Sequence, residues 1–119
     1  MTPRNAPESH LPLKPVVFHI LLALAEEASY GYGMILAVRR HSAGRIQLQT
    51  GAFYRHLDKL LADGLVEETA GPRRGDDPRR GAYYRATRAG QAALAAERQR
   101  LGNLVAALDA LTPARRRQG

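Results

Sequence analysis

Two short strand-like segments enclose a long charged stretch, and this combination constrains the fold more than any other feature of the chain. Residues 65–69 and 82–86 carry the β-branched and aromatic side chains typical of strands. Residues 71–81, which lie between them, are rich in glycine and proline and hold four arginines against two aspartates, a net charge of +2. Glycine and proline at this density mark a loop. The sequence therefore predicts a β-hairpin with a long basic tip.

The chain before the hairpin begins with two predicted helices. Residues 16–24, which follow Pro15, are apolar nearly all round, so this helix must be covered on more than one side. We expect one side to face its own core and another to face a second copy of the chain. A turn at 29–33, which contains two glycines, then precedes a short helix over 34–41 that ends in a run of basic residues.

A third helix is predicted between Thr50, as its N-cap, and Gly64, as the residue after its C-cap. Apolar side chains recur within it at helical spacing, at Phe53, Leu57, Leu60 and Leu61. Residues 46–49 alternate between apolar and polar, but over four residues this predicts no more than a stub of strand.

The segment after the hairpin predicts one long helix. Thr87 is its N-cap candidate, and the helix is expected from residue 88 to about residue 111. Leucines follow the 3-4-3 spacing of a coiled-coil seam, at Leu101, Leu104, Leu108 and Leu111, with Leu94 one heptad earlier. Such a helix is about 36 Å long, which exceeds the needs of so small a domain. We therefore expect its far end to pack on a partner.

This order of elements defines the predicted fold class: mainly α with a small β-hairpin, a winged helix-turn-helix plus a C-terminal dimerisation helix. In that arrangement the third helix enters the major groove of DNA and the hairpin loop lies along the backbone. The predicted divisions are a flexible N-terminal arm (1–13), a winged-helix DNA-binding domain (14–87), a dimerisation helix (88–111) and a basic tail (112–119). The length of 119 residues leaves room for one domain.

The charge of the chain favours a polyanionic partner. There are 18 Lys and Arg against 11 Asp and Glu, which gives +7, and all the cations except Lys14 and Lys59 are arginine. Arginine pairs with phosphates and guanine edges through a planar fork. An abundance of arginine and alanine also fits a GC-rich genome, so the composition alone decides nothing. The positions of the charges on the fold must therefore show whether the chain binds a polyanion.

Placement on the third helix indicates a DNA-reading face. With its apolar residues turned inward, Gly51, Arg55 and Lys59 point outward. Arg55 lies within the first two turns, where it can reach a base edge, and Tyr54 on the flank suits a phosphate. The predicted DNA contacts, including four arginines of the hairpin tip, are Gln49, Thr50, Gly51, Ala52, Tyr54, Arg55, Lys59, Arg73, Arg74, Arg79 and Arg80. The alternative is a solvated cationic face and a soluble loop tip.

Four motifs carry a resemblance to a known family. They are Tyr-Gly-Tyr at 30–32, Gly-Ala-Phe-Tyr at 51–54, Leu-Asp-Lys-Leu at 57–60 with Gly-Leu-Val at 64–66, and Tyr-Tyr-Arg-Ala-Thr-Arg-Ala-Gly at 83–90. Together they make residues 13–90 resemble the PadR family of transcriptional regulators. The family pattern near 51–55 is similar to Gly-Thr-Leu-Tyr-Pro. Here Ala52 removes a hydroxyl and Arg55 replaces the proline, so base readout is expected to differ, and Ala86 stands where a larger apolar residue is usual.

The resemblance implies a transcriptional regulator that is induced by a small, often aromatic, effector. We expect a cytoplasmic bacterial homodimer, associated with the nucleoid when bound, that represses by occluding a promoter at a pseudo-palindromic operator. The doubly apolar first helix and the leucine seam predict the dimer interface, formed by Val16, His19, Ile20, Leu94, Leu101, Leu104, Leu108 and Leu111. His19 and the tyrosines Tyr32, Tyr83 and Tyr84 have two interpretations, as packing residues or as the lining of an effector pocket.

Other classes of function are less well supported. The absence of cysteine excludes a disulfide framework, a thiolate metal site and a cysteine nucleophile. The histidines have no metal-binding spacing, and neither Asp76 with Asp77 nor Asp58 with Asp63 offers a rigid catalytic cleft, so neither metal, cofactor nor enzymatic activity is expected. The longest apolar run, 16–25, is too short to span a membrane, and residues 1–14 contain no signal-peptide core. The remaining alternative is a winged helix that docks proteins without specific DNA binding.

Overall fold

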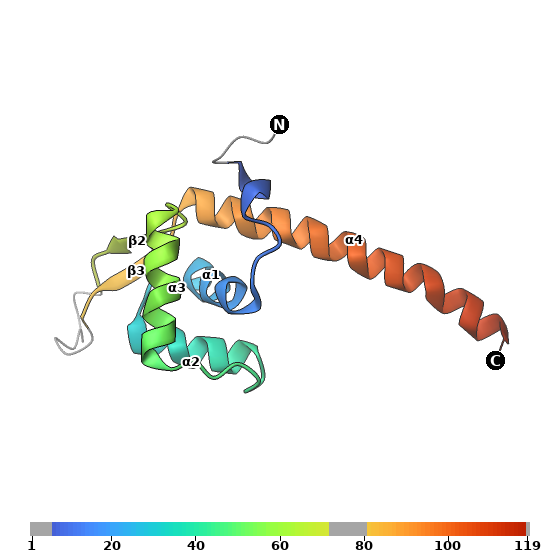
Figure 1. Ribbon diagram of the computed structural model, residues 1–119, viewed down its shortest axis with the longest axis horizontal. Helices are drawn as coiled ribbons and strands as arrows, with labels where there is room; N and C mark the ends of the chain where they lie inside the picture. The colour runs from blue at the N-terminus through green and yellow to red at the C-terminus, as the bar shows by residue number, and fades with distance from the viewer. Residues whose placement is uncertain (1–5, 72–80, 119) are drawn as a thin grey trace.

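The computed structural model describes residues 6–71 and 81–118, and for 112–118 it describes the backbone alone (Figure 1). The elements, in chain order, are η1 (Pro7–His10), α1 (Pro15–Glu26), β1 (Ser29–Tyr30), α2 (Gly31–His41), α3 (Thr50–Ala62), β2 (Val66–Thr69), β3 (Tyr83–Ala86) and α4 (Arg88–Gln118). The predicted fold class is confirmed: a mainly helical chain with a small antiparallel sheet and a long C-terminal helix.

The core lies where α1, α2 and α3 meet. Its largest fully buried side chains are Ile20 and Leu21 of α1, Met34 and Val38 of α2, and Phe53, Leu57 and Leu60 of α3. The nearly all-round apolar pattern of α1 has a simple cause, because α1 contacts α2, α3, α4 and β3. This crowding gives α1 a covered surface on several sides within a single chain.

The sheet differs from expectation in one strand. Its order is β1-β3-β2, with both pairs antiparallel; Tyr30 lies opposite Tyr83, and Val66 opposite Ala86. The predicted stub of strand at 46–49 is wrong, since these residues form no ladder. Ile46 and Leu48 instead pack against the core from a loop, so their alternation records one-sided burial rather than strand pairing. The extra strand is β1, which was predicted as part of a turn; α2 then begins at Gly31.

The turn from α3 into β2 is built by Gly64. Its φ is +74°, its N–H bonds to the carbonyl of Leu61 at 3.1 Å, and the N–H of Leu65 bonds to the carbonyl of Leu60 at 3.0 Å. These two bonds make a Schellman motif, which confirms the predicted role of Gly64. Thr50 is not the N-cap of α3. The carbonyl of Gln49 already accepts the N–H of Phe53 at 2.9 Å, so the helix begins one residue earlier than predicted.

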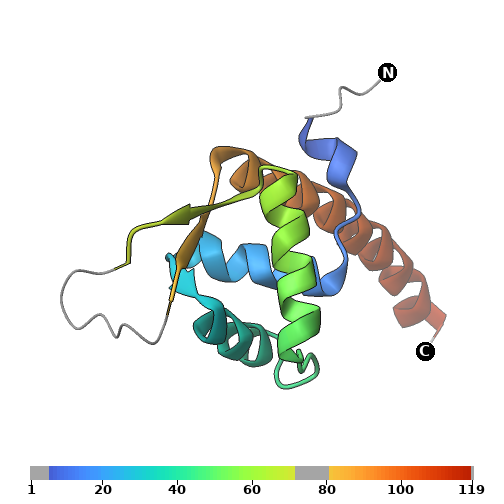
Figure 2. The same ribbon diagram turned by 60° about the vertical axis from the view of Figure 1, so that its left-hand side comes forward.

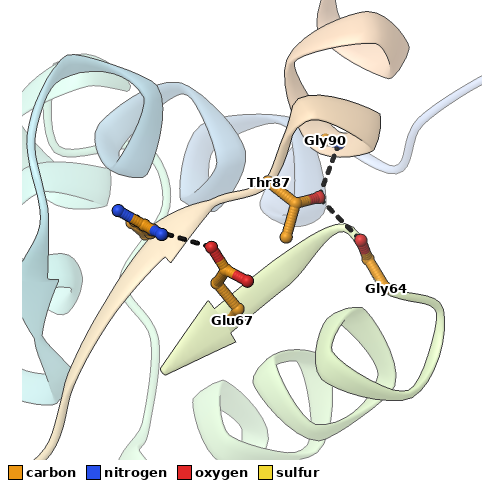
Figure 3. A network of polar contacts seen from close by, with 5 residues as sticks. Gly64, Glu67, Thr87 and Gly90 are labelled. Atoms are coloured by element: carbon orange, nitrogen blue, oxygen red, sulfur yellow. Dashed lines mark hydrogen bonds and ion pairs between the residues drawn. The ribbon is translucent and has the colours of Figure 1, made fainter. Parts of the chain in front are cut away.

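Thr87 caps α4 as predicted and also joins it to α3. Its hydroxyl accepts the N–H of Gly90 at 3.1 Å and donates to the carbonyl of Gly64 at 2.6 Å, as Figure 3 shows. A Cβ on Gly90 would overlap the carbonyl oxygen of Leu65, so glycine is required for α4 to approach the chain this closely. These contacts therefore hold the start of α4 against the turn between α3 and β2.

The N-terminal segment packs on α4, a contact that the sequence pattern did not indicate. η1 contacts α4, and Leu13 is buried in the core. The N–H of Leu13 donates to the carboxylate of Glu97 at 2.8 Å. Glu97 is 2% exposed and also pairs with the guanidinium of Arg100. A buried carboxylate with two donors thus holds the described part of the segment, where a mobile or extended arm was expected.

α4 leaves the domain and projects away from it (Figure 1). Its first half contacts η1, α1 and β3, and Ala93 is fully buried. From residue 102 to residue 111 every side chain is exposed. The helix continues to Gln118 rather than ending near residue 111 as expected.

Candidate nucleic-acid interface

The third helix has one buried and one exposed face, as its sequence pattern predicts. Phe53, Leu57 and Leu60 are at most 2% exposed and hold α3 against the core. In Figure 2, α3 lies in front of α1 and α2. Its other side carries predicted DNA contacts that are exposed, namely Gln49, Thr50, Gly51, Arg55 and Lys59, and Ala52, which is half-buried. The rigid core positions this row of side chains.

Arg55 is exposed on the outer face of α3. A Cβ on Gly51 would lie 3.9 Å from its Nη1 atom, which means that the guanidinium extends back along the first turn of α3. Within the described residues no carboxylate pairs with Arg55. Its donors are therefore available for a planar acceptor such as a guanine edge or a phosphate.

Lys59 lies one turn further along the same face. Its ammonium pairs with the carboxylate of Asp63 at 3.2 Å, while its side chain stays 74% exposed. Exposed pairs of this kind contribute at most about 1 kcal/mol. Lys59 can therefore exchange this partner for a stronger one at little cost.

Tyr54 lies on the flank of α3 that faces the start of α2. Its ring packs edge-on against Phe53, with the centroids 5.0 Å apart, and 43% of the residue is exposed. A Cβ on Gly31 would lie 2.5 Å from the Tyr54 hydroxyl oxygen. Gly31, the first residue of α2, thus makes room for this ring. The sequence pattern does not indicate that role, because only the packing of two helices brings the two residues together.

The flank of α3 near the wing is acidic. Burial raises the pKa of the Tyr84 hydroxyl, and the carboxylates of Glu68 and Asp58 raise it further. Both carboxylates are exposed. They repel phosphate, so on α3 the attraction for a polyanion is concentrated on Arg55 and Lys59.

The predicted wing contacts Arg73, Arg74, Arg79 and Arg80 lie outside the described residues. The strands that lead to them are in place, since β2 and β3 pair over Val66–Thr69 and Tyr83–Ala86. Arg85, on β3, pairs with Glu67 across the ladder at 2.7 Å (Figure 3). Its charge is therefore already matched within the sheet.

The residues predicted for the dimer interface occupy three kinds of position. Ile20 is completely buried in the core of its own chain and has no surface left for a partner. The half-buried group is Val16, His19, Leu94 and Leu101, and the exposed group is Leu104, Leu108 and Leu111, each more than half exposed. Val105, which lies outside the 3-4-3 leucine pattern, is 55% exposed beside them.

The tyrosines and His19 now have definite environments. Tyr83 is buried and its ring lies 5.5 Å from that of Tyr30, Tyr84 is half-buried against the core, and Tyr32 is 62% exposed. The Nδ1 atom of His19 lies 2.6 Å from the carbonyl oxygen of Pro15, within its own helix. Among the described residues there is no cluster of three side chains able to hold a metal ion, and no helix has both the length and the apolar character that a bilayer crossing needs.

Comparisons with known proteins agree with this architecture. A PadR family transcription regulator from Clostridium difficile has a TM-score of 0.66 at 18% identity, covering 83% of this chain and 99% of its own. RosR of H. salinarum has a TM-score of 0.58 at 24% identity, covering 86% and 98%, and a transcriptional regulator from Clostridium thermocellum has 0.57 at 18%, covering 95% and 97%. These likenesses show the fold.

No curated protein sequence matches the chain significantly. A family-level match exists, however: residues 20–96, well over half of the chain, match the transcriptional regulator PadR-like family. This range runs from α1, through α3 and the wing strands, into α4. The chain belongs to the PadR-like family of transcriptional regulators.

Proposed function

We propose that this protein is a homodimeric transcriptional repressor that binds a pseudo-palindromic operator and is released by a small molecule. As a DNA-binding regulator it acts on the chromosome, in the cytoplasm of a bacterial cell. One observation carries the proposal most strongly: the outer face of α3 presents Arg55 without a carboxylate partner among the described residues, on a helix whose opposite face is held by the core. A rigid helix with an available guanidinium is suited to reading a groove.

The contacts on DNA divide into two kinds. Arg55, near the start of α3, reads a base edge, and the small residues Gly51 and Ala52 beside it allow the backbone of the helix to approach the groove closely. Tyr54 and Lys59, on either side of Arg55, contact phosphates. The wing arginines add backbone contacts that do not depend on sequence.

Dimerisation involves the projecting half of α4. Leu104, Leu108 and Leu111 share one stripe of the helix and are exposed in the single chain, and this supports a two-fold contact with a second copy. Leu101 and Leu94 extend the stripe toward the domain. The two α3 helices then meet successive major grooves, with half-site centres about 34–36 Å apart.

DNA binding is tested by fluorescence anisotropy with the duplex upstream of the protein's own gene and a shuffled duplex, at several salt concentrations. We expect Arg55→Ala to cost about 1–3 kcal/mol on the native duplex and to relax the preference at one base step. Arg74→Ala should weaken binding to both duplexes alike and lower the salt slope. Arg88→Ala, at the start of α4, is the matched control and should change neither the affinity for the native duplex nor the affinity for the shuffled duplex. Equal losses from Arg55→Ala on both duplexes would refute base readout.

The alternative function is a winged helix that docks another protein. It predicts a shallow salt slope and no dependence on Arg55. The same titration therefore separates the two functions, because a docking module leaves the native and shuffled duplexes bound equally weakly.

A further inference from the structure

Hydrogen bonds join α4 to its own domain near its start and again at Glu97. Near the start, the Thr87 hydroxyl donates to the carbonyl of Gly64 at 2.6 Å. Further along, the carboxylate of Glu97 accepts the N–H of Leu13, in the N-terminal segment, at 2.8 Å. The stretch of helix from Thr87 to Glu97 is about 15 Å long. Because an α-helix is a stiff rod, two fixed points at this separation define its direction.

Between these two points, the packing of α4 on the domain is comparatively smooth. The buried residues there are Gly90 and Ala93, and Leu94 packs against the core while it stays half-buried. Small residues offer no ridge that interlocks with a neighbouring surface, so they allow a helix to tilt. A hydrogen bond, in contrast, tolerates only a narrow range of distances and angles. The bond at Glu97 therefore limits the tilt of α4 more sharply than the packing does.

The donor in this bond is itself firmly placed. The side chain of Leu13 is 9% exposed and belongs to the core, while its N–H bonds to Glu97. The Glu97 carboxylate is 2% exposed, and its other oxygen pairs with the guanidinium of Arg100. In Figure 1 the N-terminal segment lies across α4 where that helix leaves the domain. The core thus holds α4 through a buried carboxylate that has a donor on each oxygen.

Beyond Glu97 the domain gives α4 little support. Among the described side chains of α4, Glu97 is the last that is buried, and every one from residue 102 to residue 111 is exposed. Leu108, within the stripe proposed for the dimer, lies about 16 Å further along the axis. A tilt of about 10° at Glu97 therefore moves the domain by about 3 Å relative to Leu108. Both domains of a two-fold dimer move, so the two α3 helices shift by up to about 6 Å, nearly two base-pair steps.

We propose that Glu97 is a positioning residue for DNA binding. Its bond to the Leu13 N–H sets the direction in which α4 leaves the domain, and this direction sets the separation of the two α3 helices in the dimer. The inference rests on the homodimer and the DNA binding proposed above. It adds to them the residue that selects the spacing of the two half-sites.

The first test measures distances in the DNA-free protein by pulsed EPR. The chain contains no cysteine, so one introduced cysteine carries the spin label at a single site. Ala62→Cys, exposed at the end of α3, reports the separation of the two α3 helices. Ala106→Cys, on the side of α4 away from the leucine stripe, reports the dimer seam. We expect one narrow distance distribution at each site when Glu97 is present.

Glu97→Met keeps the length of the side chain but offers no oxygen to the N–H of Leu13. We expect it to shift the distance between the Ala62 labels by about 3–6 Å, or to broaden it to a similar extent, and to leave the Ala106 distance unchanged. Glu97→Leu also lacks the acceptor and should give the same result. Glu97→Gln retains a carbonyl oxygen that accepts this N–H, so it should keep the native distances. An unchanged Ala62 distance in Glu97→Met and Glu97→Leu overturns the proposal.

Val38→Ala is the control for a general loss of stability. It removes two buried methyl groups from α2 and should lower the free energy of unfolding without moving the Ala62 labels. If Val38→Ala broadens their distance as much as Glu97→Met does, a general loosening of the domain explains the effect, and the proposal is rejected.

The inference and the proposed dimer fail in different ways. An Ala106 label that gives no distance between subunits would refute the dimer. Labels at Ala62 and Ala106 of the same chain, diluted with unlabelled protein, still measure the direction of α4 within one subunit. A shift of this distance in Glu97→Met supports the role of Glu97 in directing α4, whereas an unchanged distance overturns it.

The second test uses the native duplex of the anisotropy titration with two base pairs inserted at the centre of its footprint. We expect the native protein to bind this duplex about tenfold more weakly than the original one. Glu97→Met should lose only about threefold or less, because its α3 helices adjust to the new spacing. Equal losses in the two proteins would overturn the link between Glu97 and half-site spacing. A native protein that binds neither duplex specifically refutes the proposed function instead.

Discussion

The two halves of α4 differ in how their side chains are buried. Over residues 88–101 the helix packs on its own domain through a glycine, an alanine and a carboxylate, at Gly90, Ala93 and Glu97. Over residues 102–111 all of its large apolar side chains are exposed. Gly90 lies where the chain approaches itself most closely and Leu94 packs against the core, whereas Leu104, Leu108 and Leu111 lie beyond the reach of the domain.

This contrast shows that hydrophobicity alone does not locate the contacts of a helix within its own chain. Close approach selects for small side chains, because a larger one at Gly90 would overlap the backbone of Leu65. The exposed leucine stripe is typical of a surface that another molecule covers. The first half of α4 completes the domain, and we propose that the second half builds the dimer.

The largest effect is expected in the second half, from Leu104→Asp. Two unpaired carboxylates at the seam of the dimer cost about 3–5 kcal/mol or more, so the dimer should dissociate and high-affinity operator binding should be lost. Sedimentation measures the dissociation at micromolar concentration. Ala106→Asp places the same charge about 200° further around the helix and should leave the dimer intact. A dimer that survives Leu104→Asp would move the interface elsewhere.

Gly90→Ala tests the close approach in the first half. Because the added methyl group overlaps the carbonyl oxygen of Leu65, we expect a loss of about 2–4 kcal/mol in the free energy of unfolding. Urea denaturation measures it, with the oligomeric state followed in parallel. A variant as stable as the native protein would show that β2 and α4 separate easily. That result would contradict the close contact that the Thr87 hydrogen bonds hold in place.

Glu97→Gln probes the buried carboxylate. The hydrogen bond from Arg100 holds the pKa of Glu97 below its ordinary value of 4.5, and the Leu13 N–H assists, while burial opposes both. A depressed pKa in the folded state stabilises the protein above the ordinary pKa, and this stability is lost as the pH falls through the folded-state pKa.

We therefore expect Glu97→Gln to lower the free energy of unfolding by about 1–3 kcal/mol at pH 7. The difference from the native protein should shrink toward pH 3. Chemical denaturation at several pH values measures both, and a difference that grows on acidification would contradict the assignment. Glu67→Gln, which removes a carboxylate from an exposed pair, is the control and should change stability little.

The smallest effect, and the only stabilising one, is expected from Gly102→Ala. In the described part of the chain, no atom outside its chain neighbours and the nearby helix backbone lies within 4 Å of the position where its Cβ would stand, and the residue lies on the side of α4 away from the leucine stripe. Alanine should stabilise this helix by about 0.5–1 kcal/mol. Compared with Gly90→Ala, the same substitution then has opposite signs in the two halves. A loss at Gly102 would indicate that a partner covers that side as well.

Local patterns predicted much of this fold. The apolar spacing of α3, Gly64 after its end and Thr87 before α4 each act within a few residues, through the backbone bonds that a helix end leaves unsatisfied. The candidate DNA face was predictable for the same reason, because the inward residues of α3 determine which residues point outward. Whether Arg55 reads a base stays a prediction.

The errors concern contacts between distant parts of the chain. Ile46 and Leu48 alternate like a strand but pack from a loop, whereas Ser29 and Tyr30 form a strand because Tyr83 and Tyr84 lie beside them. The division of the chain at residues 13, 87 and 111 stays a prediction, although the described part of the first segment is docked on α4.

Helix periods, caps and turns are properties of neighbouring residues, so they could be read along the chain. The contacts between distant segments were decided by tertiary packing. A buried carboxylate on Glu97 and a close approach at Gly90 depend on residues far apart in sequence, and the energies of these contacts exist only once the helices have met.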